Sequence, residues 1–429
     1  MVAKVFSMLD MQKDKDIPIQ SRKNCITILG TDPALCGKIK FNTLSNRKNV
    51  EGALPWNKSE KLREWKEIDN HYLLYYFETY YLINAEKKVF SALEMIADTN
   101  KFNPFIDMLN SVKWDGVPRV DSLLTDYLGV KKNEYSSECL RLLMLAAISR
   151  AFSPGTKFDY VLVLQGKQGI GKSTFFMKLC CNDEWYLENL KNIDKGKDSA
   201  ELIQGKIIVE FGELLAVKGK TEEIKAFVTL KSDEYREPYA REKEKRYRTC
   251  VFVGTTNEAQ FLTDKTGNRR FLPLHCGAVP ITKSLFVDEE ELKAEFMQAW
   301  AEIYQIYLSE KFNLVMPAKL KGYVDEALED CMEDDPMVGL IQGWLDQCGQ
   351  DYVCNLMIAS EVFGVDEPDR RMLNKITDVM NNAVIGWERK GEHRFGGKIG
   401  KQKCYVRIKP PDGFVQININ NVKGDLPFD

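Results

Sequence analysis

The sequence predicts an α/β protein whose central domain is built on a parallel sheet. Between residues 158 and 256, short apolar runs rich in β-branched residues alternate with helical stretches, the pattern of strands joined by crossover helices. One such run, residues 160–165, leads into a glycine-rich turn and then into an apolar helix pattern. The composition is 44% hydrophobic and 29% charged, which is typical of a globular protein and argues against wholesale disorder.

The first 100 residues predict a small N-terminal domain, mixed α/β or helical. Residues 1–20 are polar with alternating charges and are expected to form a loose arm. Residues 24–56 alternate short apolar segments with turn signals, which predicts a layer of strands and turns. An amphipathic helix pair over residues 65–95 is expected to pack on this layer, with four aromatic residues in the core: Tyr72, Tyr75, Tyr76 and Tyr80.

Residues 101–152 predict a helical segment that precedes the sheet. An Asn-Pro pair starts its first helix, a Trp-Asp-Gly turn follows at Trp114, and Gly129 ends the second helix. A third helix is expected over residues 136–152. The sheet domain itself is assigned to residues 153–334, with a long helix near its end from about residue 289 to residue 311.

The last unit, residues 335–429, is predicted to be winged-helix-like. Three helices precede two basic strands joined by a glycine hairpin, and the strands run to about Arg407. The expected helices are Met337–Gln347, Asn355–Phe363 and Asp369–Asn382.

The sequence favours a cytoplasmic protein. No run reaches the roughly 18 apolar residues of a membrane span, and the amino terminus lacks the apolar core of a signal peptide, so no membrane association is expected. Eleven cysteines occur without CxxC spacing, several inside apolar runs, which favours reduced, buried thiols over disulfides or zinc ligands. A net charge of −3 means that any case for nucleic-acid binding depends on local patches.

A phosphate-binding motif lies between the first predicted strand of the sheet and its helix. Residues 166–173 fit the pattern G-x-x-x-x-G-K-[ST] in the strand–turn–helix context that this motif requires. Its glycines let successive backbone N–H groups point inward, and the helix N-terminus adds its dipole. Lys172 is expected to contact the β- and γ-phosphates of ATP, and the Ser173 hydroxyl to bind Mg²⁺. The predicted nucleotide-binding residues are Gly166, Lys167, Gln168, Gly169, Ile170, Gly171, Lys172, Ser173 and Thr174.

Two acidic residues follow the next apolar run. Glu210 ends that run, and Glu213 comes three positions later. A carboxylate at the carboxyl end of a neighbouring strand can orient Mg²⁺, and a second can polarise the attacking water. We assign Glu210 to the metal shell and Glu213 to the general base, with the reverse order as the alternative.

An amide and two arginines complete the predicted catalytic set. Asn257 directly follows the strand pattern of residues 248–256, and this strand is expected beside the one that precedes the glycine-rich turn. From there its amide can hydrogen-bond the attacking water and the γ-phosphate. Arg269 and Arg270 follow a tight Thr-Gly-Asn turn, and arginine stabilises the charge that spreads over a transferring phosphoryl group. The sequence leaves open whether they serve their own nucleotide or a neighbour's.

Together these motifs resemble the virulence-associated protein E family, P-loop ATPases of phages and genomic islands related to superfamily 3 helicases within the AAA+ group. The resemblance covers roughly residues 103–274 and is carried by WDGVPRVDSLL, SPGTKFDYVLVLQGKQGIGKST, IIVEFGEL, REPYARE and VGTTNEAQFLTDKTGNRRFLPL.

The resemblance implies roles for the residues singled out above. Residues 166–173 would be Walker A, Glu210 and Glu213 the Walker B acids, Asn257 sensor 1, and Arg269 or Arg270 a finger inserted into a neighbouring subunit's site. It also implies an AAA+-like core and a ring, usually a hexamer, around nucleic acid in a bacterial cell.

Priming activity is not expected of this chain. Related replication proteins often carry an amino-terminal primase, but about 100 residues precede the Trp-Asp-Gly segment, with no carboxylate cluster or zinc ligands suited to polymerisation. A separate primase or initiator protein is therefore an expected partner.

Two segments are candidates for contacts with single- or double-stranded DNA. Residues 231–248 carry seven basic and five acidic side chains, and lie where superfamily 3 proteins place a hairpin that projects into the ring channel. Residues 387–409 carry eight basic residues against two glutamates. Basic side chains can hold phosphates and aromatic rings can stack on bases. The candidates are Arg236, Tyr239, Arg241, Lys243 and Lys245 in the first segment, and Arg394, Lys398, Lys401 and Lys403 in the second.

The sequence thus predicts an ATP-driven, ring-forming DNA helicase or translocase for the replication of a phage or genomic island. The alternative is a nucleotide-gated switch, acting in phage interference or defence, that binds DNA or a partner without unwinding. Stimulation of ATP turnover by single-stranded DNA, together with strand displacement, distinguishes the two.

Overall fold

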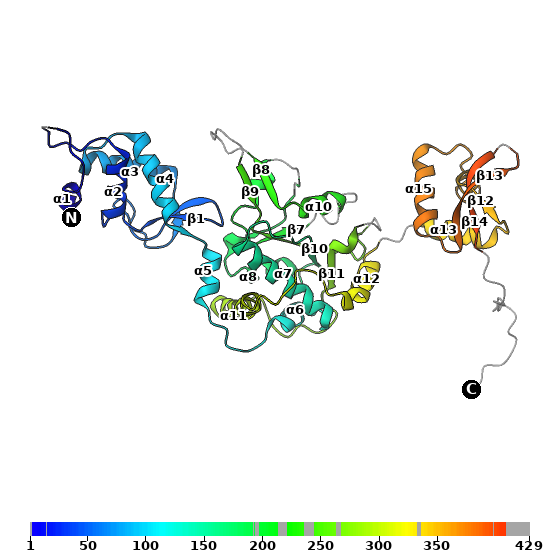
Figure 1. The fold of residues 1–429 in the computed structure, drawn as a ribbon. Helices are drawn as coiled ribbons and strands as arrows, with labels where there is room; N and C mark the ends of the chain where they lie inside the picture. The colour runs from blue at the N-terminus through cyan, green and yellow to red at the C-terminus, as the bar shows by residue number, and fades with distance from the viewer. Residues whose placement is uncertain are drawn as a thin grey trace. The chain divides into compact units, whose positions relative to one another are not determined.

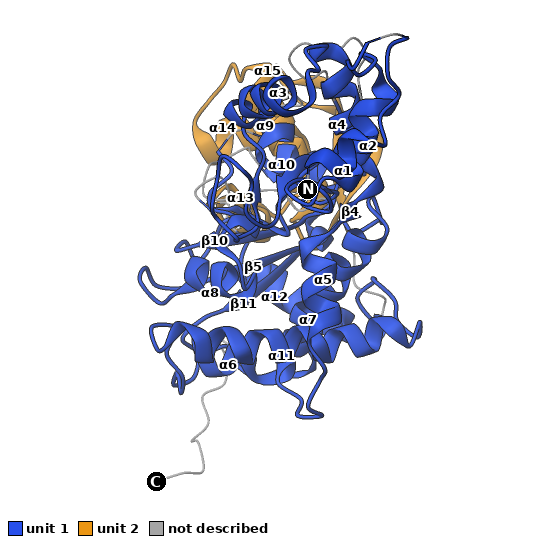
Figure 2. Cartoon of the chain, turned by 90° about the vertical axis from the view of Figure 1, so that its left-hand side faces the viewer, with its two compact units in different colours: residues 1–332 blue, residues 333–429 orange. Residues whose placement is uncertain are grey.

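The computed structural model describes residues 2–13, 15–191, 193, 197–212, 221–235, 244–262, 267–332, 336–397 and 399–408. The chain divides into two compact units, residues 1–332 and 333–429 (Figure 2).

The amino-terminal part of the first unit is a small α/β layer with its own core. Its four-stranded sheet has the order β3-β2-β1-β4, and α2 and α4 pack together, with α4 against β1. The elements are α1 Val2–Phe6, α2 Arg22–Thr31, β1 Ile39–Asn42, β2 Arg47–Val50, β3 Arg63–Glu64, α3 Glu67–Tyr81, α4 Glu86–Thr99 and β4 Lys101–Phe102.

Two sequence predictions for this layer are wrong. The expected loose arm contains α1, and its Val5 and Leu9 are buried in the core, so apolar burial holds the segment in place. The first part of the predicted strand layer is the helix α2, because the Ser21 side chain caps its amino end and its apolar residues recur at helical spacing.

The prediction that four tyrosines of α3 are core residues holds only for Tyr76, which is 7% exposed. Tyr72, Tyr75 and Tyr80 are 45%, 66% and 49% exposed. The core face of α3 is instead formed by Leu73, Tyr76, Phe77 and Tyr81. The aromatic residues of α3 lie on more than one face of the helix, so their spacing alone did not identify the buried face.

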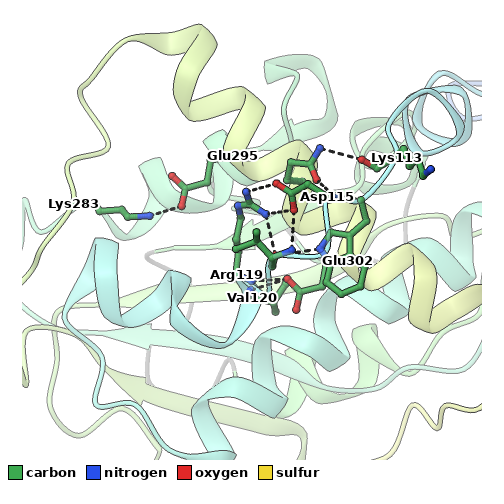
Figure 3. A network of polar contacts seen from close by, with 10 residues as sticks. Lys113, Asp115, Arg119, Val120, Lys283, Glu295 and Glu302 are labelled. Carbon is green, nitrogen blue, oxygen red and sulfur yellow. Dashed lines mark hydrogen bonds and ion pairs between the residues drawn. The ribbon is translucent and has the colours of Figure 1, made fainter.

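Three helices lead into the sheet domain, as the sequence predicted: α5 Pro104–Ser111, α6 Val120–Leu128 and α7 Glu134–Phe152. Asn103 caps α5 and Gly129, with φ of 64°, ends α6. The Trp-Asp-Gly turn between α5 and α6 is held against the long helix α11, Glu289–Leu308. Glu302 of α11 accepts hydrogen bonds from the backbone N–H groups of Arg119 and Val120, which begin α6 (Figure 3).

Five parallel strands form the central sheet in the order β11-β5-β10-β7-β6, which confirms the predicted parallel sheet. The strands are β5 Val161–Gln165, β6 Tyr186–Leu187, β7 Ile208–Phe211, β10 Val251–Thr256 and β11 Phe271–His275. The sequence pattern predicted β5, β7 and β10, and β10 lies between the other two.

Helices cover both faces of this sheet (Figure 1). Because side chains alternate along a strand, Leu162 and Leu164 of β5 pack in one core and Val161 and Val163 in the other. The first core includes α7, α11 and α8, Lys172–Leu179; the second includes α10, Thr221–Val228. Burial on both sides explains why the strand sequences are continuous apolar runs. Further helices of this unit are α9 Lys197–Leu202 and α12 Lys321–Asp330.

A two-stranded hairpin projects from the sheet domain between α10 and β10 (Figure 1). Its antiparallel strands are β8 Ser232–Tyr235 and β9 Glu244–Tyr247. Arg248, which is buried at its base, forms two 2.7 Å contacts with Asp233 and donates to the Phe227 carbonyl at 2.6 Å. Its guanidinium also lies 4.1 Å from the Phe227 ring centroid. The hairpin base is therefore fixed to α10.

The second unit has its own core, formed by three helices and a three-stranded sheet of order β12-β14-β13. The elements are α13 Pro336–Gln347, β12 Tyr352–Val353, α14 Asn355–Phe363, α15 Arg370–Asn382, β13 Trp387–Phe395 and β14 Gly400–Arg407. The helices agree with the predicted ones to within one residue.

In the part of the chain that the structure describes, no helix is both long and apolar enough to cross a membrane. Nine of the eleven cysteines are buried, and Cys36 and Cys348 are not.

Candidate nucleotide site

The sheet topology brings three of the predicted motifs to one edge. The glycine-rich turn follows β5, Glu210 lies near the end of β7, and Asn257 follows β10 directly. Because the strands are parallel and adjacent, their carboxyl ends meet at the same edge of the sheet. A cavity of about 550 Å³ lies there. Its lining is Gln168, Gly169, Gly171, Lys172, Ser173, Thr174, Glu188, Asn189, Glu210, Gly212, Thr255, Thr256, Asn257, Glu258 and Phe286.

Two glycines of the turn have backbone conformations and surroundings that disfavour a side chain. Gly171 has φ of 98°, and a Cβ there would lie 3.0 Å from the Leu285 side chain. Gly166 has φ of 155°, and a Cβ would lie 3.0 Å from the Cys276 carbonyl oxygen. Gly171 immediately precedes the first residue of α8, so the turn delivers the amino end of that helix to the cavity.

Lys172 is the first residue of α8, and its side chain folds back over the turn. Its Nζ donates to the carbonyls of Gly166 and Lys167 at 2.7 and 3.0 Å, and to the Asn257 amide oxygen at 2.8 Å. Burial lowers the pKa of Lys172 below its usual value, while nearby Glu210 favours the charged form. All three partners are neutral oxygens, so a phosphate oxygen can take their place without breaking an ion pair.

Glu210 is held by three hydroxyl groups in a buried position. Its side chain accepts a hydrogen bond from Ser173 Oγ at 2.8 Å on Oε1, and the Thr255 hydroxyl donates to the same oxygen. The Tyr186 hydroxyl donates to Oε2. Burial, and then the negative charge of Glu210, raise the pKa of Tyr186 well above its usual value, so this hydroxyl stays a donor.

Neither Tyr186 nor Thr255 was among the predicted site residues. Thr255 lies two positions before Asn257 and could have been found, since alternation places both on one side of the strand. Tyr186 belongs to the two-residue strand β6, which pairs with β7 and is too short to show a periodic pattern.

The donor set fits a magnesium-bound nucleoside triphosphate. Ser173 Oγ and the Glu210 carboxylate are the hard oxygens that Mg²⁺ prefers, and backbone N–H groups and an ammonium suit phosphate oxygens. Among the described residues, no group of three or more His, Cys, Asp or Glu side chains is placed to hold a metal ion. A magnesium ion here would therefore need phosphate oxygens or water to complete its shell.

The two predicted arginines lie at the opposite edge of the sheet. Arg269 and Arg270 form a short 3₁₀ turn immediately before β11. In the register of the sheet, the first residue of β11, Phe271, pairs with Val161, the first residue of β5. The glycine-rich turn starts after the fifth residue of β5, roughly 16 Å further along at about 3.3 Å per residue. Both arginines line a different hollow, together with Asp325 and Glu329 of α12.

Several predicted residues lie outside the described part of the chain. Glu213, the predicted base, is one of them, as are Arg236, Tyr239, Arg241 and Lys243 between β8 and β9, and Lys398.

The remaining candidates for DNA contacts are exposed. Lys245 lies on β9 with its ammonium 5.2 Å from the Tyr247 ring centroid. In the second unit, Arg394 lies on β13 and Lys401 and Lys403 lie on β14, and Lys401 pairs with Glu392 at 2.5 Å.

The polar face of α15 was missed by sequence reasoning. Arg371, Asn374 and Lys375 are exposed there, opposite the buried residues Ile376 and Met380. The helical spacing of the apolar residues was a usable signal for this face.

One comparison with known proteins, the match to a family model, agrees with the sequence analysis on the family. No curated protein matches the chain. Three solved apo structures of the NrS-1 C terminal region overlap with 86% of the chain and 95–96% of their own length, at 13–14% identity and TM-scores of 0.44–0.47. The model of the Virulence-associated protein E-like domain matches residues 109–333, which include α6, α7, the five-stranded sheet and the cavity at its edge. The chain therefore belongs to the virulence-associated protein E-like family.

Proposed function

We propose that this protein is an ATPase that works as a ring-forming DNA helicase or translocase in the replication of a phage or genomic island. The observation that carries the proposal is the convergence of Lys172, Ser173, Glu210 and Asn257 on one cavity from three adjacent strands. We infer from the same arrangement that the sheet domain has an AAA+-like core.

Each residue at this edge has a role in the proposed reaction. Backbone N–H groups of the glycine-rich turn and the Lys172 ammonium bind the β- and γ-phosphates. Ser173 and Glu210 hold Mg²⁺, which would neutralise the charge that develops on the transferred phosphoryl group. Asn257 already accepts a hydrogen bond from Lys172, and it orients the attacking water beside the γ-phosphate.

The general base is assigned to Glu213. Since three hydroxyl groups hold Glu210, that carboxylate suits a fixed metal shell better than proton transfer. Glu213→Gln should then bind Mg²⁺-ATP but hydrolyse it slowly, whereas Glu210→Gln should weaken the binding of Mg²⁺ and raise the Mg²⁺ concentration that turnover requires. If Glu210→Gln traps ATP and Glu213→Gln turns over normally, the two roles are exchanged.

The arginines are proposed to act on a neighbouring subunit. Their position before β11, roughly 16 Å of strand from the turn that binds phosphate, supports action in trans. A finger from a neighbour completes a site that has no arginine among the described residues that line it. The site would therefore be active only in an assembled ring, and we propose a hexamer.

Two surfaces are proposed to bind DNA. The β8–β9 hairpin is proposed to project into the ring channel, with Lys245 among its contacts. The second unit is proposed to be winged-helix-like, with α15 docking in a groove and the β13–β14 hairpin lying on the backbone. The exposed Arg371, Asn374 and Lys375 make α15 suitable for that role.

The experiment compares ATP turnover with and without single-stranded DNA, and measures strand displacement on a forked duplex. A motor predicts stimulated turnover and displacement. Stimulated turnover without strand displacement would favour a translocase. DNA binding that depends on nucleotide, with neither stimulated turnover nor strand displacement, would favour a nucleotide-gated switch. The Lys172→Ala variant measures the background ATP turnover. If the wild type shows no turnover above that background under any condition, the proposal is contradicted.

A further inference from the structure

Phe286 is an exposed aromatic residue at the nucleotide cavity. It lies in the loop between β11 and α11 and is 78% exposed. Among the described residues that line the cavity, it is the one aromatic side chain; the others are glycines and residues with polar side chains. None of the roles proposed for phosphate or Mg²⁺ binding uses this aromatic ring.

The loop that carries Phe286 is fixed on the side that precedes it. The backbone N–H groups of Thr282 and Lys283 donate to the Asp126 carbonyl at 3.0 and 2.9 Å. Lys283 also pairs with Glu295 of α11 at 2.5 Å (Figure 3). These contacts attach the loop to α6 and α11, so the exposure of the ring does not come from a loosely held chain.

The residues on either side of Phe286 set its place relative to the glycine-rich turn. Leu285 is 5% exposed and packs against Gly171, at the start of α8. The Ser284 hydroxyl accepts a hydrogen bond from the Phe286 N–H at 3.1 Å. Asp288 caps the amino end of α11. The ring is therefore next to the turn, while the described residues offer it no stacked ring or cation.

We propose that Phe286 stacks on the base of the bound nucleotide. The proposal rests on the proposed ATP site, to which it adds a base position. A nucleotide with its phosphates on the turn has a flat, apolar base at the end of the sugar, and an aromatic ring held beside the turn offers the face that such a base stacks on. Stacking recognises ring area rather than hydrogen-bonding groups. The site is therefore selective for purine over pyrimidine nucleotides and discriminates little between adenine and guanine.

The test separates the base from the phosphates. Calorimetry with Mg²⁺ measures binding of ADP and of inorganic pyrophosphate, which has the two phosphates without sugar or base. Phe286→Ala should weaken ADP binding roughly 5- to 150-fold and leave pyrophosphate binding unchanged. Phe286→Trp should retain ADP binding. Tyr323→Ala removes an aromatic residue of α12 that is 48% exposed and does not line the cavity, and it should change neither ligand.

Four results would contradict the proposal, in distinguishable ways. Equal ADP binding by wild type and Phe286→Ala would exclude stacking. Loss of both ligands would mean that Phe286 shapes the phosphate cradle. Wild-type protein that binds neither ligand would reject the proposed ATP site itself. In the wild type, GDP should bind about as well as ADP, and CDP more weakly; the opposite order would also contradict a stacked base.

Discussion

The hydrogen bond from Tyr186 to Glu210 permits a quantitative prediction. In Tyr186→Phe the ring stays and the hydroxyl is lost, so Oε2 of a carboxylate that is 1% exposed loses the donor that the structure gives it. A hydrogen bond to a charged group contributes about 1.5–3 kcal/mol, and leaving a buried acceptor unsatisfied costs a similar amount. We expect a loss of about 1.5–3 kcal/mol in the free energy of unfolding. For a domain of this size that is a fall in Tm of roughly 3–12 °C.

The assay is calorimetric melting of the nucleotide-free protein, followed by titration of Mg²⁺ in the presence of ADP. With Glu210 less firmly oriented, the Mg²⁺ concentration for half-maximal ADP binding should rise several-fold, while binding without Mg²⁺ stays the same. Tyr127→Phe is the matched control. Its hydroxyl donates to Glu295 at 2.7 Å, but Glu295 also contacts Lys283 and is 22% exposed, so its loss should be about 0.5–1.5 kcal/mol. Equal melting of the two variants, with unchanged Mg²⁺ dependence, would refute the reasoning.

Three further predictions follow from the site and the hairpin. Lys172→Ala should abolish ATP turnover while melting close to wild type, since an ammonium held by carbonyls contributes little to folding; near-normal turnover would reject the site. Variants lacking Arg269 and Arg270 should lose about 10³–10⁵-fold in ATP turnover, and mixing them with Lys172→Ala subunits should restore a fraction of the wild-type turnover. If mixed rings are confirmed by mass spectrometry and turnover is not restored, either the arginines act in cis or the ring needs every site active. Arg248→Gln should cost about 3–5 kcal/mol by chemical denaturation, whereas Lys319→Gln, which breaks an exposed pair with Glu134, should cost less than about 1 kcal/mol.

The sequence predicted those parts of the site whose geometry is local. The glycine-rich turn specifies its own backbone through glycines that tolerate positive φ, and the helix after it follows from the apolar spacing. Asn257 could be placed because its strand begins with an apolar run and ends in two threonines, and Asn257 follows them directly. The helices of the last unit could be predicted because each has apolar residues at helical spacing.

What the sequence could not provide depends on contacts between distant segments. Tyr186 meets Glu210 only because β6 pairs with β7 across 20 intervening residues. The distance of Arg269 from the turn required the register between β11 and β5. Phe286 belongs to no motif, and its place depends on the path that Lys283 and Leu285 impose on a loop. The tyrosines of α3 were misplaced because aromatic residues satisfy a helical period on either face.

Strand β10 joins two parts of the molecule that are proposed to do different work. Asn257 follows its last residue, and the hairpin ends at Tyr247, shortly before its first. The strand spans roughly 20 Å at about 3.3 Å per residue and is hydrogen-bonded to a neighbour on each side. Because it is paired along both sides, β10 is expected to move together with its neighbouring strands. We propose that a change at a bound γ-phosphate reaches the hairpin through a movement of the sheet as a whole. We therefore expect each step along DNA to come from a rotation of one subunit relative to its neighbour. The angle of that rotation would set the length of the step.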